Sequence, residues 1–364
     1  DEVVVVASEK PAIKTAFNID YSQIDEVKPG HALIIQKNGE FGQHQIRQPG
    51  DKKSCSFERI YFSRGNDPDI YRERKMLGRL LVPRVLKATN FDLKNTVFSY
   101  IPNTAETAFY GMMAGIEDYL ISKQKDHIVD AKPSVDSIEE MLSFRPRVEK
   151  IVIKDAKLRT FITDDAHRDE MVAHVYDTTY EVIRKDKDTL VVIDDSIVRG
   201  TTLEKSILTM LDRLHPKKIV VVSSAPQIRF PDCYGIDMSR MGDFVAFRAV
   251  IQLIREQGKD FLLGEVYEQC QRSIRDRDAV NYVKRLYEQF TDEEISEKIA
   301  DIVRPAGMNA ELEVVYQTVE NLHKAIPNNS GDWYFTGDYP TPGGMLVANR
   351  SYINYMDGKL VRAY

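Results

Sequence analysis

The sequence TLVVIDDSIVRGTTL at residues 189–203 decides the fold of this chain. Its apolar run at 190–193 has no polar alternation, which predicts a central strand of a parallel sheet, covered on both faces. The segment 196–202 follows with hydroxyl and backbone N–H groups, and Gly200 permits a tight turn. Apolar residues then recur at helical spacing and predict a core-facing helix: Leu203, Ile207, Leu211 and Leu214.

Two adjacent carboxylates, Asp194 and Asp195, lie between the predicted strand and this loop. A loop at a helix N-terminus favours anions, because unpaired N–H groups and the helix dipole both point at the ligand. Carboxylates beside it can accept hydrogen bonds from vicinal hydroxyls or hold a hard divalent cation. Phosphate on one side and a diol on the other describe a ribose 5-phosphate. The alternative, an ordinary strand-to-helix turn capped by two aspartates, does not explain the paired acids and the hydroxyl-rich loop together.

Other nucleotide-binding motifs are excluded, since neither G-x-x-x-x-G-K-[ST] nor a G-x-G-x-x-G after a strand is present. Residues 191–203 instead resemble the phosphoribosyl pyrophosphate (PRPP) signature of type I phosphoribosyltransferases. Within them, the wording DDSIVRGTT is similar to that of the glutamine PRPP amidotransferase family. Further segments resemble this family in the same order: 55–64, 159–162, 225–231, 234–238 and 335–342.

The resemblance implies an α/β fold, in which a parallel sheet is flanked by helices. It places a phosphoribosyltransferase domain at 51–305 and a helical or irregular extension, packed on that domain, at 306–364. Residues 1–50 resemble the last strands of the family's glutaminase domain. We therefore expect a fragment that lacks most of that domain and its catalytic cysteine, and Cys55 cannot replace it because it matches the linker region.

The resemblance also implies the residues of the site. Asp194 and Asp195 would position the ribose, and Arg159 and Lys154 would complete the catalytic set. Mg²⁺ would be held by Asp194, Asp195 and Thr104. PRPP would contact the residues Ser196, Ile197, Val198, Arg199, Gly200, Thr201, Thr202, Asn103 and Thr104. For Arg199, an ordinary surface arginine is the alternative.

The segment IPNTAE at 101–106 stands where the family holds the leaving pyrophosphate, usually with Pro-Asp-Ser-Gly. The hydroxyl is kept as Thr104, but the acid has become Asn103 and the glycine Ala105. Asn can still form hydrogen bonds, and Ala is tolerated if the backbone is not left-handed. A plain helix N-cap is the alternative for this segment.

The segment 154–162 matches the family's basic loop that closes over PRPP, with Lys154, Lys157 and Arg159 as candidates. A solvated cluster of Lys and Arg is the alternative, and the spacing is one residue shorter than the family's. Displacement of pyrophosphate builds negative charge that Mg²⁺, loop amides and basic side chains can stabilise.

Composition fits a soluble cytoplasmic enzyme. The 364 residues are 43% hydrophobic and 29% charged, which suffices for one large domain with extensions. A net charge of −6 gives no general attraction to nucleic acid or acidic membranes. The sequence contains no apolar run long enough to span a bilayer. Three widely separated cysteines suit a reducing compartment.

The function that the resemblance implies is transfer of ammonia to C1 of PRPP, giving phosphoribosylamine and pyrophosphate in purine synthesis. In the intact family member glutamine supplies the ammonia, so this chain is expected to use ammonia only. The resemblance also implies a homo-oligomer and inhibition by purine nucleotides. A non-enzymatic PRPP-binding regulator and a base-salvage phosphoribosyltransferase are the alternatives.

Some relatives carry an iron–sulfur cluster, which needs four thiolates. Cys55 matches one ligand position and Cys233 lies one place from a second, whereas Gly331 and Tyr334 occupy the other two. We therefore expect no cluster.

Along the rest of the chain, strands alternate with helices, as in parallel α/β folds. Strands are expected at 3–7, 57–62, 96–101, 150–153 and 218–224, with a hairpin at 32–46 that turns at Asn38-Gly39. Helices are expected at 69–82, ending before Pro83, from about 105, and at 244–256, 279–290, 292–303 and 312–323. The polar segment 122–141 suggests an insertion.

Overall fold

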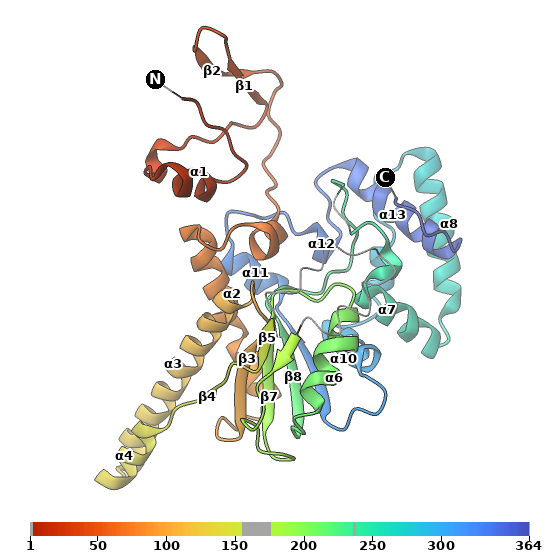
Figure 1. Ribbon diagram of the computed structural model, residues 1–364. Helices are drawn as coiled ribbons and strands as arrows, with labels where there is room; N and C mark the ends of the chain where they lie inside the picture. Colours follow the sequence, from red (N-terminus) through yellow and green to blue (C-terminus); the bar gives the residue numbers. More distant parts are fainter. Residues whose placement is uncertain (1–2, 155–175, 236–237, 364) are drawn as a thin grey trace.

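The computed structural model describes residues 3–154, 176–235 and 238–363. At its centre lies a five-stranded parallel sheet with the order β4-β3-β7-β8-β9 (Figure 1). These strands are β4 (Arg147–Val148), β3 (Thr96–Tyr100), β7 (Thr189–Asp194), β8 (Lys218–Ser223) and β9 (Glu311–Tyr316). The predicted α/β fold with a parallel sheet is confirmed.

Strand β7 lies in the middle of the sheet and is buried on both faces. Leu190 and Val192 belong to one apolar cluster, and Val191 and Ile193 belong to the other. None of the four side chains is exposed. The apolar run therefore marks a strand between two layers of helices, as its lack of alternation predicts.

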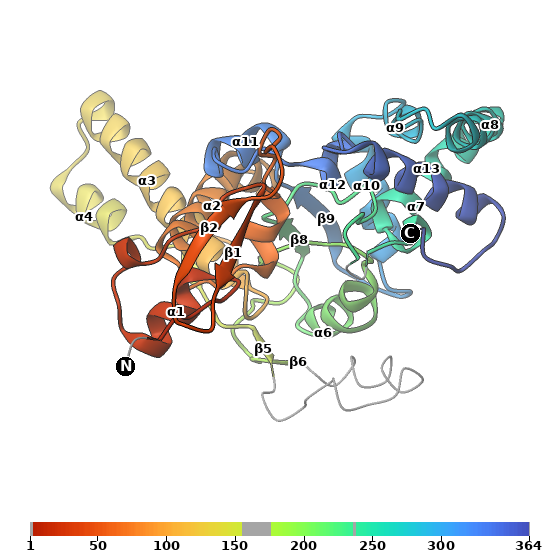
Figure 2. The ribbon, with the colours of Figure 1, turned by 90° about the horizontal axis from the view of Figure 1, so that it is seen from above.

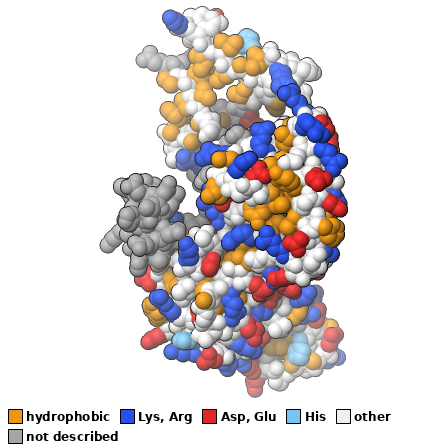
Figure 3. All heavy atoms as spheres, turned by 90° about the vertical axis from the view of Figure 1, so that its right-hand side faces the viewer, with side chains coloured by type: hydrophobic (Ala, Val, Ile, Leu, Met, Phe, Trp, Pro, Cys, Tyr) orange, Lys and Arg blue, Asp and Glu red, His pale blue; other side chains and the backbone are white. Residues whose placement is uncertain are grey.

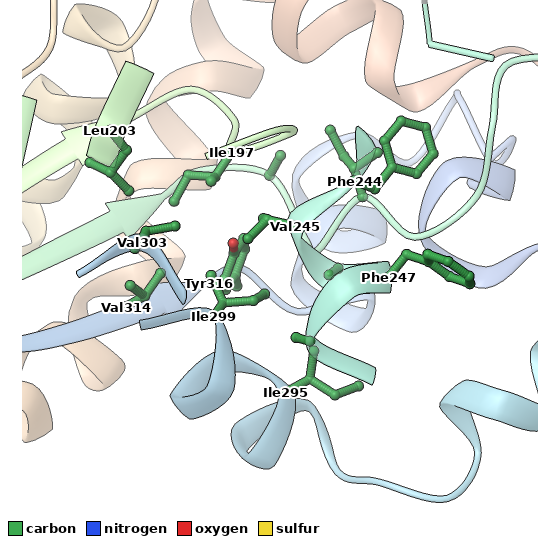
Figure 4. Packing of buried hydrophobic residues seen from close by; sticks show 14 of the residues in the cluster. Ile197, Leu203, Phe244, Val245, Phe247, Ile295, Ile299, Val303, Val314 and Tyr316 are labelled. Carbon is green, nitrogen blue, oxygen red and sulfur yellow. The ribbon is translucent and has the colours of Figure 1, made fainter. Parts of the chain in front are cut away.

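Helices cover both faces of the sheet. One face carries α2 (Pro68–Ala88) and α3 (Glu106–Ala131). The opposite face carries the π-helix η5 (Leu203–Leu208) with its continuation α6 (Thr209–Asp212), and α7 (Val245–Glu256) and α10 (Asp292–Val303). Figure 4 shows Leu203, Val245 and Val303 of these helices in one apolar cluster with Val314 of β9.

Further helices lie at the two ends of the molecule. Helices α3 and α4 (Val135–Ser143) extend to one side, and α8 (Asp260–Asp276) and α13 (Pro342–Met356) lie on the other (Figure 2). Shorter elements complete the C-terminal half: η6 (Met241–Asp243), α9 (Lys284–Tyr287), α11 (Val319–Ala325) and α12 (Trp333–Thr336).

The N-terminal segment stands apart from the sheet (Figure 1). It contains α1 (Lys10–Phe17), the turn η1 (Tyr21–Gln23) and the hairpin of β1 (His31–Ile35) and β2 (Phe41–Gln45), as predicted around Asn38-Gly39. The Glu9 carboxylate accepts a hydrogen bond from the Arg64 N–H (2.8 Å) and thereby joins this segment to the rest.

Two predicted strands are wrong, and a third forms outside the main sheet. Residues 57–62 begin a helical turn that becomes the π-helix η2 (Glu58–Phe62), because Phe57 and Ile60, three residues apart, are buried together. Residues 3–7 do not form a strand in the described structure, and their side chains are exposed. The strand near 150–153 is β5 (Val152–Lys154), which pairs antiparallel with β6 (Tyr176–Thr178) outside the main sheet.

The helix predicted at 312–323 is also wrong, since the segment begins as β9. An apolar run cannot by itself distinguish a buried strand from a buried helix. A strand of the core sheet therefore lies within residues 306–364, which the sequence assigned to an extension. Helix α2 continues through Pro83, because Leu81, Val82, Val85 and Leu86 are buried against its neighbours.

The segment 122–141, expected as an insertion, is largely helical, as the end of α3 and most of α4. One further expectation needs correction. Of the helix expected at 279–290, the α-helical part is Lys284–Tyr287. Among the described residues, no helix has the length and apolarity that crossing a bilayer requires.

Candidate functional site

The carboxyl ends of β3 and β7 open into a cavity of about 720 Å³. The acid pair and its loop form one side, and residues 101–104 after β3 form another. Every predicted site residue that the structure describes lines this cavity: Asn103, Thr104, Lys154, Asp194, Asp195, Ser196, Ile197, Val198, Arg199, Gly200, Thr201 and Thr202. Lys157 and Arg159 lie outside the described residues.

Hydrogen bonds fix the acid pair at the end of β7. The Asp195 N–H donates to Asp194 Oδ1 (2.8 Å), and the Ser196 hydroxyl donates to Asp195 Oδ1 (3.0 Å). The Thr104 side chain also hydrogen-bonds Asp195. Behind the pair, the Ala225 N–H donates to the Asp195 carbonyl (3.0 Å). The loop after β3 and the loop after β7 therefore meet at Asp195.

The loop that follows the acids is shaped by Gly200, whose φ of +75° is unfavourable for a side-chain-bearing residue. A Cβ at Gly200 would also lie 2.8 Å from Val303 Cγ1. The Val245 N–H, at the start of α7, donates to the Val198 carbonyl (2.9 Å), and Arg248 Nη2 donates to the Arg199 carbonyl (2.6 Å). Helix α7 thus supports the loop from outside the cavity.

Burial raises the pKa of Asp194 well above its usual range, and the charge of Asp195 adds to this effect. Burial also raises the pKa of Asp195, although hydrogen bonds from Ser196 and Thr104 and the charge of Arg74 oppose the rise. Two adjacent carboxylates that are shielded from water favour a ligand that brings positive charge or hydroxyl donors, because such a ligand offsets the cost of their burial. A divalent cation and a sugar diol both meet this requirement.

The donors around the acid pair fit Mg²⁺. Asp194, Asp195 and Thr104 offer oxygen atoms, which hard cations prefer. The described residues contain no cluster of three or more His, Cys, Asp or Glu suited to a metal. The acid pair offers two carboxylates, and Mg²⁺ is commonly held by one or two carboxylates together with substrate phosphates.

Sequence reasoning missed a group of aromatic residues that line the same cavity as the acid pair. Tyr61 and Phe62 come from η2, Phe57 directly precedes it, and Tyr176 comes from β6. Burial and the charges of Asp194 and Asp195 raise the pKa of Tyr176 to about 12, and they raise that of Tyr61 as well. The segment 55–64 carried a family resemblance that could have indicated Tyr61, whereas no motif marks Tyr176.

The cysteines do not provide the donors of an iron–sulfur cluster. Cys55 forms a β-bridge with Gly331, which has no side-chain ligand, and the Tyr334 hydroxyl donates to Asp232 Oδ1 (2.9 Å). Burial raises the pKa of the thiols of both Cys55 and Cys233 to about 11, so both are protonated near neutral pH. The third cysteine is buried elsewhere, within α8.

A second cavity of about 730 Å³ follows the edge strand β9, between α2 and α10. Four of its lining residues form two ion pairs, one between Arg84 and Glu293 (2.6 Å) and one between Lys218 and Glu313 (2.6 Å). Arg84 also donates to the Tyr316 carbonyl (2.9 Å) and so covers part of the strand edge. The predicted site residues line the first cavity, which is therefore the candidate site.

Comparison with known proteins shows what the chain as a whole is similar to. The chain matches no family model. It is 29% identical to the amidophosphoribosyltransferase of Escherichia coli over 69% of this chain and 44% of that protein. It is 26% identical to the amidophosphoribosyltransferase of Saccharomyces cerevisiae over 90% of this chain and 56% of that protein. The chain thus spans about half the length of the curated relatives that it matches.

Solved structures give the same likeness. The glutamine PRPP amidotransferase of Bacillus subtilis, complexed with ADP and GMP, covers 87% of this chain, with a TM-score of 0.52 and 24% identity. The chain covers 53% of that protein. The resemblance that the motifs indicate, and the type I phosphoribosyltransferase fold, are confirmed.

Proposed function

We propose that this chain, which is similar to amidophosphoribosyltransferases along most of its length, binds PRPP and transfers ammonia to its C1 carbon. The products would be phosphoribosylamine and pyrophosphate. One observation carries the proposal: the phosphate loop, the acid pair and the segment 101–104 line a single cavity and meet through Thr104 and Asp195.

In this proposal the loop 196–202 takes the 5-phosphate of PRPP. Its hydroxyls and backbone N–H groups donate to the phosphate oxygens, and Gly200 lets the backbone approach closely. Asp194 and Asp195 accept hydrogen bonds from the ribose hydroxyls. Their fixed position at the end of β7 holds C1 against the segment 101–104.

The leaving pyrophosphate would lie on Asn103 and Thr104. Ala105 has φ −68° and ψ −17°, in the right-handed region, so the methyl group in place of the family's glycine does not strain the backbone. Mg²⁺ held by Asp194, Asp195 and Thr104 would neutralise the charge that develops on the leaving group. Lys154, which lines the same cavity, would add positive charge, and Arg159 is proposed to do the same.

Ammonia would attack C1 on the face opposite the diphosphate, and this step needs no protein nucleophile. The aromatic side chains of Phe57, Tyr61, Phe62 and Tyr176 line the same cavity and would limit the access of water, which competes with ammonia. Under this proposal, glutamine is used only where a glutaminase part supplies the ammonia. We further propose that the protein acts in the cytoplasm as a homo-oligomer.

Purine nucleotides are proposed as inhibitors. The support is the solved relative from Bacillus subtilis, whose structure was determined with ADP and GMP.

A PRPP-binding regulator without catalytic activity is the second candidate, because Asn103 replaces the acid of the family's pyrophosphate loop. The two candidates differ in their products. The chain is incubated with PRPP and Mg²⁺, together with an ammonium salt or with a purine or pyrimidine base, and the products are separated by mass spectrometry.

The proposal expects pyrophosphate with ammonium and unchanged base. Tight PRPP binding without turnover would support the regulator, and formation of a nucleotide from a free base would support a salvage enzyme.

A further inference from the structure

The loop that is proposed to hold the leaving pyrophosphate runs from the end of β3 to the start of α3. The residues that flank it are Tyr100, the last residue of β3, and Glu106, the first residue of α3. The Tyr100 hydroxyl donates a hydrogen bond to Glu106 Oε1 (3.1 Å). This bond joins two residues six positions apart, so their side chains bridge the loop 101–105.

The Tyr100 side chain points to the helical layer of α2 and α3. It packs against the apolar cluster on that face of the sheet, which includes Phe98, two residues earlier in the strand. The centroid of its ring lies 5.1 Å from that of Phe109, in the first turn of α3. Packing therefore directs the Tyr100 hydroxyl from the sheet to the start of the helix.

The same oxygen of Glu106 accepts a second hydrogen bond, from the Tyr110 hydroxyl (2.8 Å). Tyr110 lies one turn further along α3, and 48% of its surface is exposed. The two tyrosines thus share one acceptor but differ in what they connect. The bond from Tyr100 joins the sheet to the helix across the loop, whereas the bond from Tyr110 stays within the helix.

The backbone of the loop is anchored near both flanking residues. On the side of β3, the Ile101 N–H donates to the Ile193 carbonyl of β7 (2.9 Å). On the side of α3, the Glu106 N–H donates to the Asn103 carbonyl (3.3 Å). Asn103 and Thr104, which line the cavity, lie between these anchors. A change in the separation of the two flanking residues would therefore move the side chains that face the ligand.

We propose that Glu106 is a positioning residue for the leaving group: through the bond from Tyr100, its carboxylate fixes the loop 101–105 so that Asn103 and Thr104 meet the diphosphate. The inference rests on the proposed function, in which this loop binds pyrophosphate. Neither Tyr100 nor Glu106 is among the described residues that line the cavity. Loss of the bond across the loop should therefore weaken binding of pyrophosphate, because the loop is less preorganised, and leave binding of ribose 5-phosphate unchanged.

The test measures the two parts of the ligand separately, by calorimetry on the full chain. Ribose 5-phosphate is titrated first. Pyrophosphate with Mg²⁺ is then titrated with ribose 5-phosphate at saturation, so that the phosphate loop 196–202 is already occupied.

Tyr100→Phe removes the bond across the loop, and it keeps both the ring that packs on Phe109 and the charge of Glu106. It is expected to weaken pyrophosphate binding by at least about fivefold, the net contribution of one hydrogen bond. Its affinity for ribose 5-phosphate should change by less than about twofold. Tyr110→Phe is the matched control, because it removes a hydrogen bond to the same oxygen without affecting the link across the loop. It should change both affinities by less than about twofold.

A second pair of variants separates the hydrogen bond from the charge. Glu106→Gln and Glu106→Ala both remove the charge, but only Glu106→Gln keeps an acceptor oxygen. Glu106→Gln should therefore bind pyrophosphate at least about fivefold more tightly than Glu106→Ala. Thermal unfolding of each variant verifies that it is folded.

Equal pyrophosphate affinities in Tyr100→Phe and Tyr110→Phe would overturn the proposal. An equal loss of affinity for both ligands in Tyr100→Phe would also overturn it, since that result shows a general structural role. If Tyr100→Phe does not fold, equal pyrophosphate affinities in Glu106→Gln and Glu106→Ala would have the same meaning. Failure of the wild type to bind ribose 5-phosphate or pyrophosphate would instead reject the proposed function, on which this inference rests.

Discussion

At the scale of single residues, Asp195 connects the parts of the candidate site. It receives hydrogen bonds from Ser196 on its own loop and from Thr104 on the loop after β3. The charge of Arg74 on α2 favours its ionised form and so opposes the rise of its pKa. Burial works against its charge, so these contacts and a bound ligand must offset that penalty. Of these partners, the sequence indicated Ser196 and Thr104 through family motifs, whereas Arg74 has no motif that links it to the site.

Asp188 is a buried carboxylate with a purely structural role. It bonds Arg147 Nη1 (2.6 Å) and Arg184 Nε (2.9 Å), and its surface is not exposed. Burial alone would raise the pKa of Asp188, but the hydrogen bonds from Arg184 and Arg147 outweigh burial and lower it. The ionised form therefore stabilises the fold at neutral pH, and this contribution is lost as the pH falls below about 4.

We expect Asp188→Asn to lower the free energy of unfolding by about 2–3 kcal/mol at pH 7, less than for a fully enclosed pair because both arginines reach solvent. The difference should shrink when urea unfolding is repeated near pH 3. Asp186→Asn, an exposed site two residues away, is the control and should change stability by less than about 0.5 kcal/mol. A loss of stability in Asp188→Asn that does not depend on pH would contradict the conclusion that the ionised carboxylate stabilises the fold.

The thiols of Cys55 and Cys233 should react slowly. A pKa of about 11 leaves about 0.1% thiolate at pH 8, which is about a hundredfold less than for an unperturbed thiol. Labelling by iodoacetamide, followed by peptide mass spectrometry, measures the rate in the native and the denatured chain. Native rates equal to the denatured rates would show that the thiols are not held in this protonated form.

At the scale of elements, the crossing of α2 and α3 positions the segment 101–105. Two glycines allow these helices to touch. A Cβ at Gly78 would lie 1.7 Å from the Ala108 carbonyl oxygen, and a Cβ at Gly111 would lie 1.8 Å from that of Lys75. Backbone atoms cannot yield as a flexible side chain does, so an added methyl group must separate the helices.

Gly78→Ala is therefore expected to destabilise the chain by about 3 kcal/mol, at the upper end of the range for overpacking. In α8, Gly264 has open space around its Cβ position, and Gly264→Ala should be neutral or stabilising by up to about 1 kcal/mol. Thermal and denaturant unfolding of both variants provides the comparison. Equal effects at the two sites would mean that helix propensity, not the crossing, determines the result.

Elements with a strong local signal could be predicted from the sequence. Strand β7 was found because four consecutive apolar residues precede two acids. Helix α10 was expected at 292–303, and the structure shows that Thr291 and Glu294 form a capping box at its start. Strand β9 was mistaken for a helix, since its neighbours in the sheet lie far away in the sequence. The turn η2 was missed for a similar reason, because α2 and its Arg74 hold it in place.

At the scale of the whole molecule, the described part of residues 1–50 buries almost nothing. Pro11 is its one buried residue, while Phe17, Ile34, Ile35 and Phe41 are exposed. Figure 3 shows hydrophobic side chains on the upper part of one face, where α1 and the hairpin lie. Such a surface is typical of an interface. The motifs could not indicate how this segment is oriented.

The central claim is that the cavity at the ends of β3 and β7 performs PRPP chemistry through its acid pair. The most direct measurement is the rate of pyrophosphate release from PRPP with an ammonium salt, with and without Mg²⁺, in the wild type and in Asp195→Asn. The account predicts Mg²⁺-dependent release in the wild type. It predicts a loss of at least about a hundredfold in the variant, because the substitution removes a charge that, under the proposal, contacts the ribose and the metal. Equal release by both proteins, or wild-type release that does not depend on Mg²⁺, would contradict it.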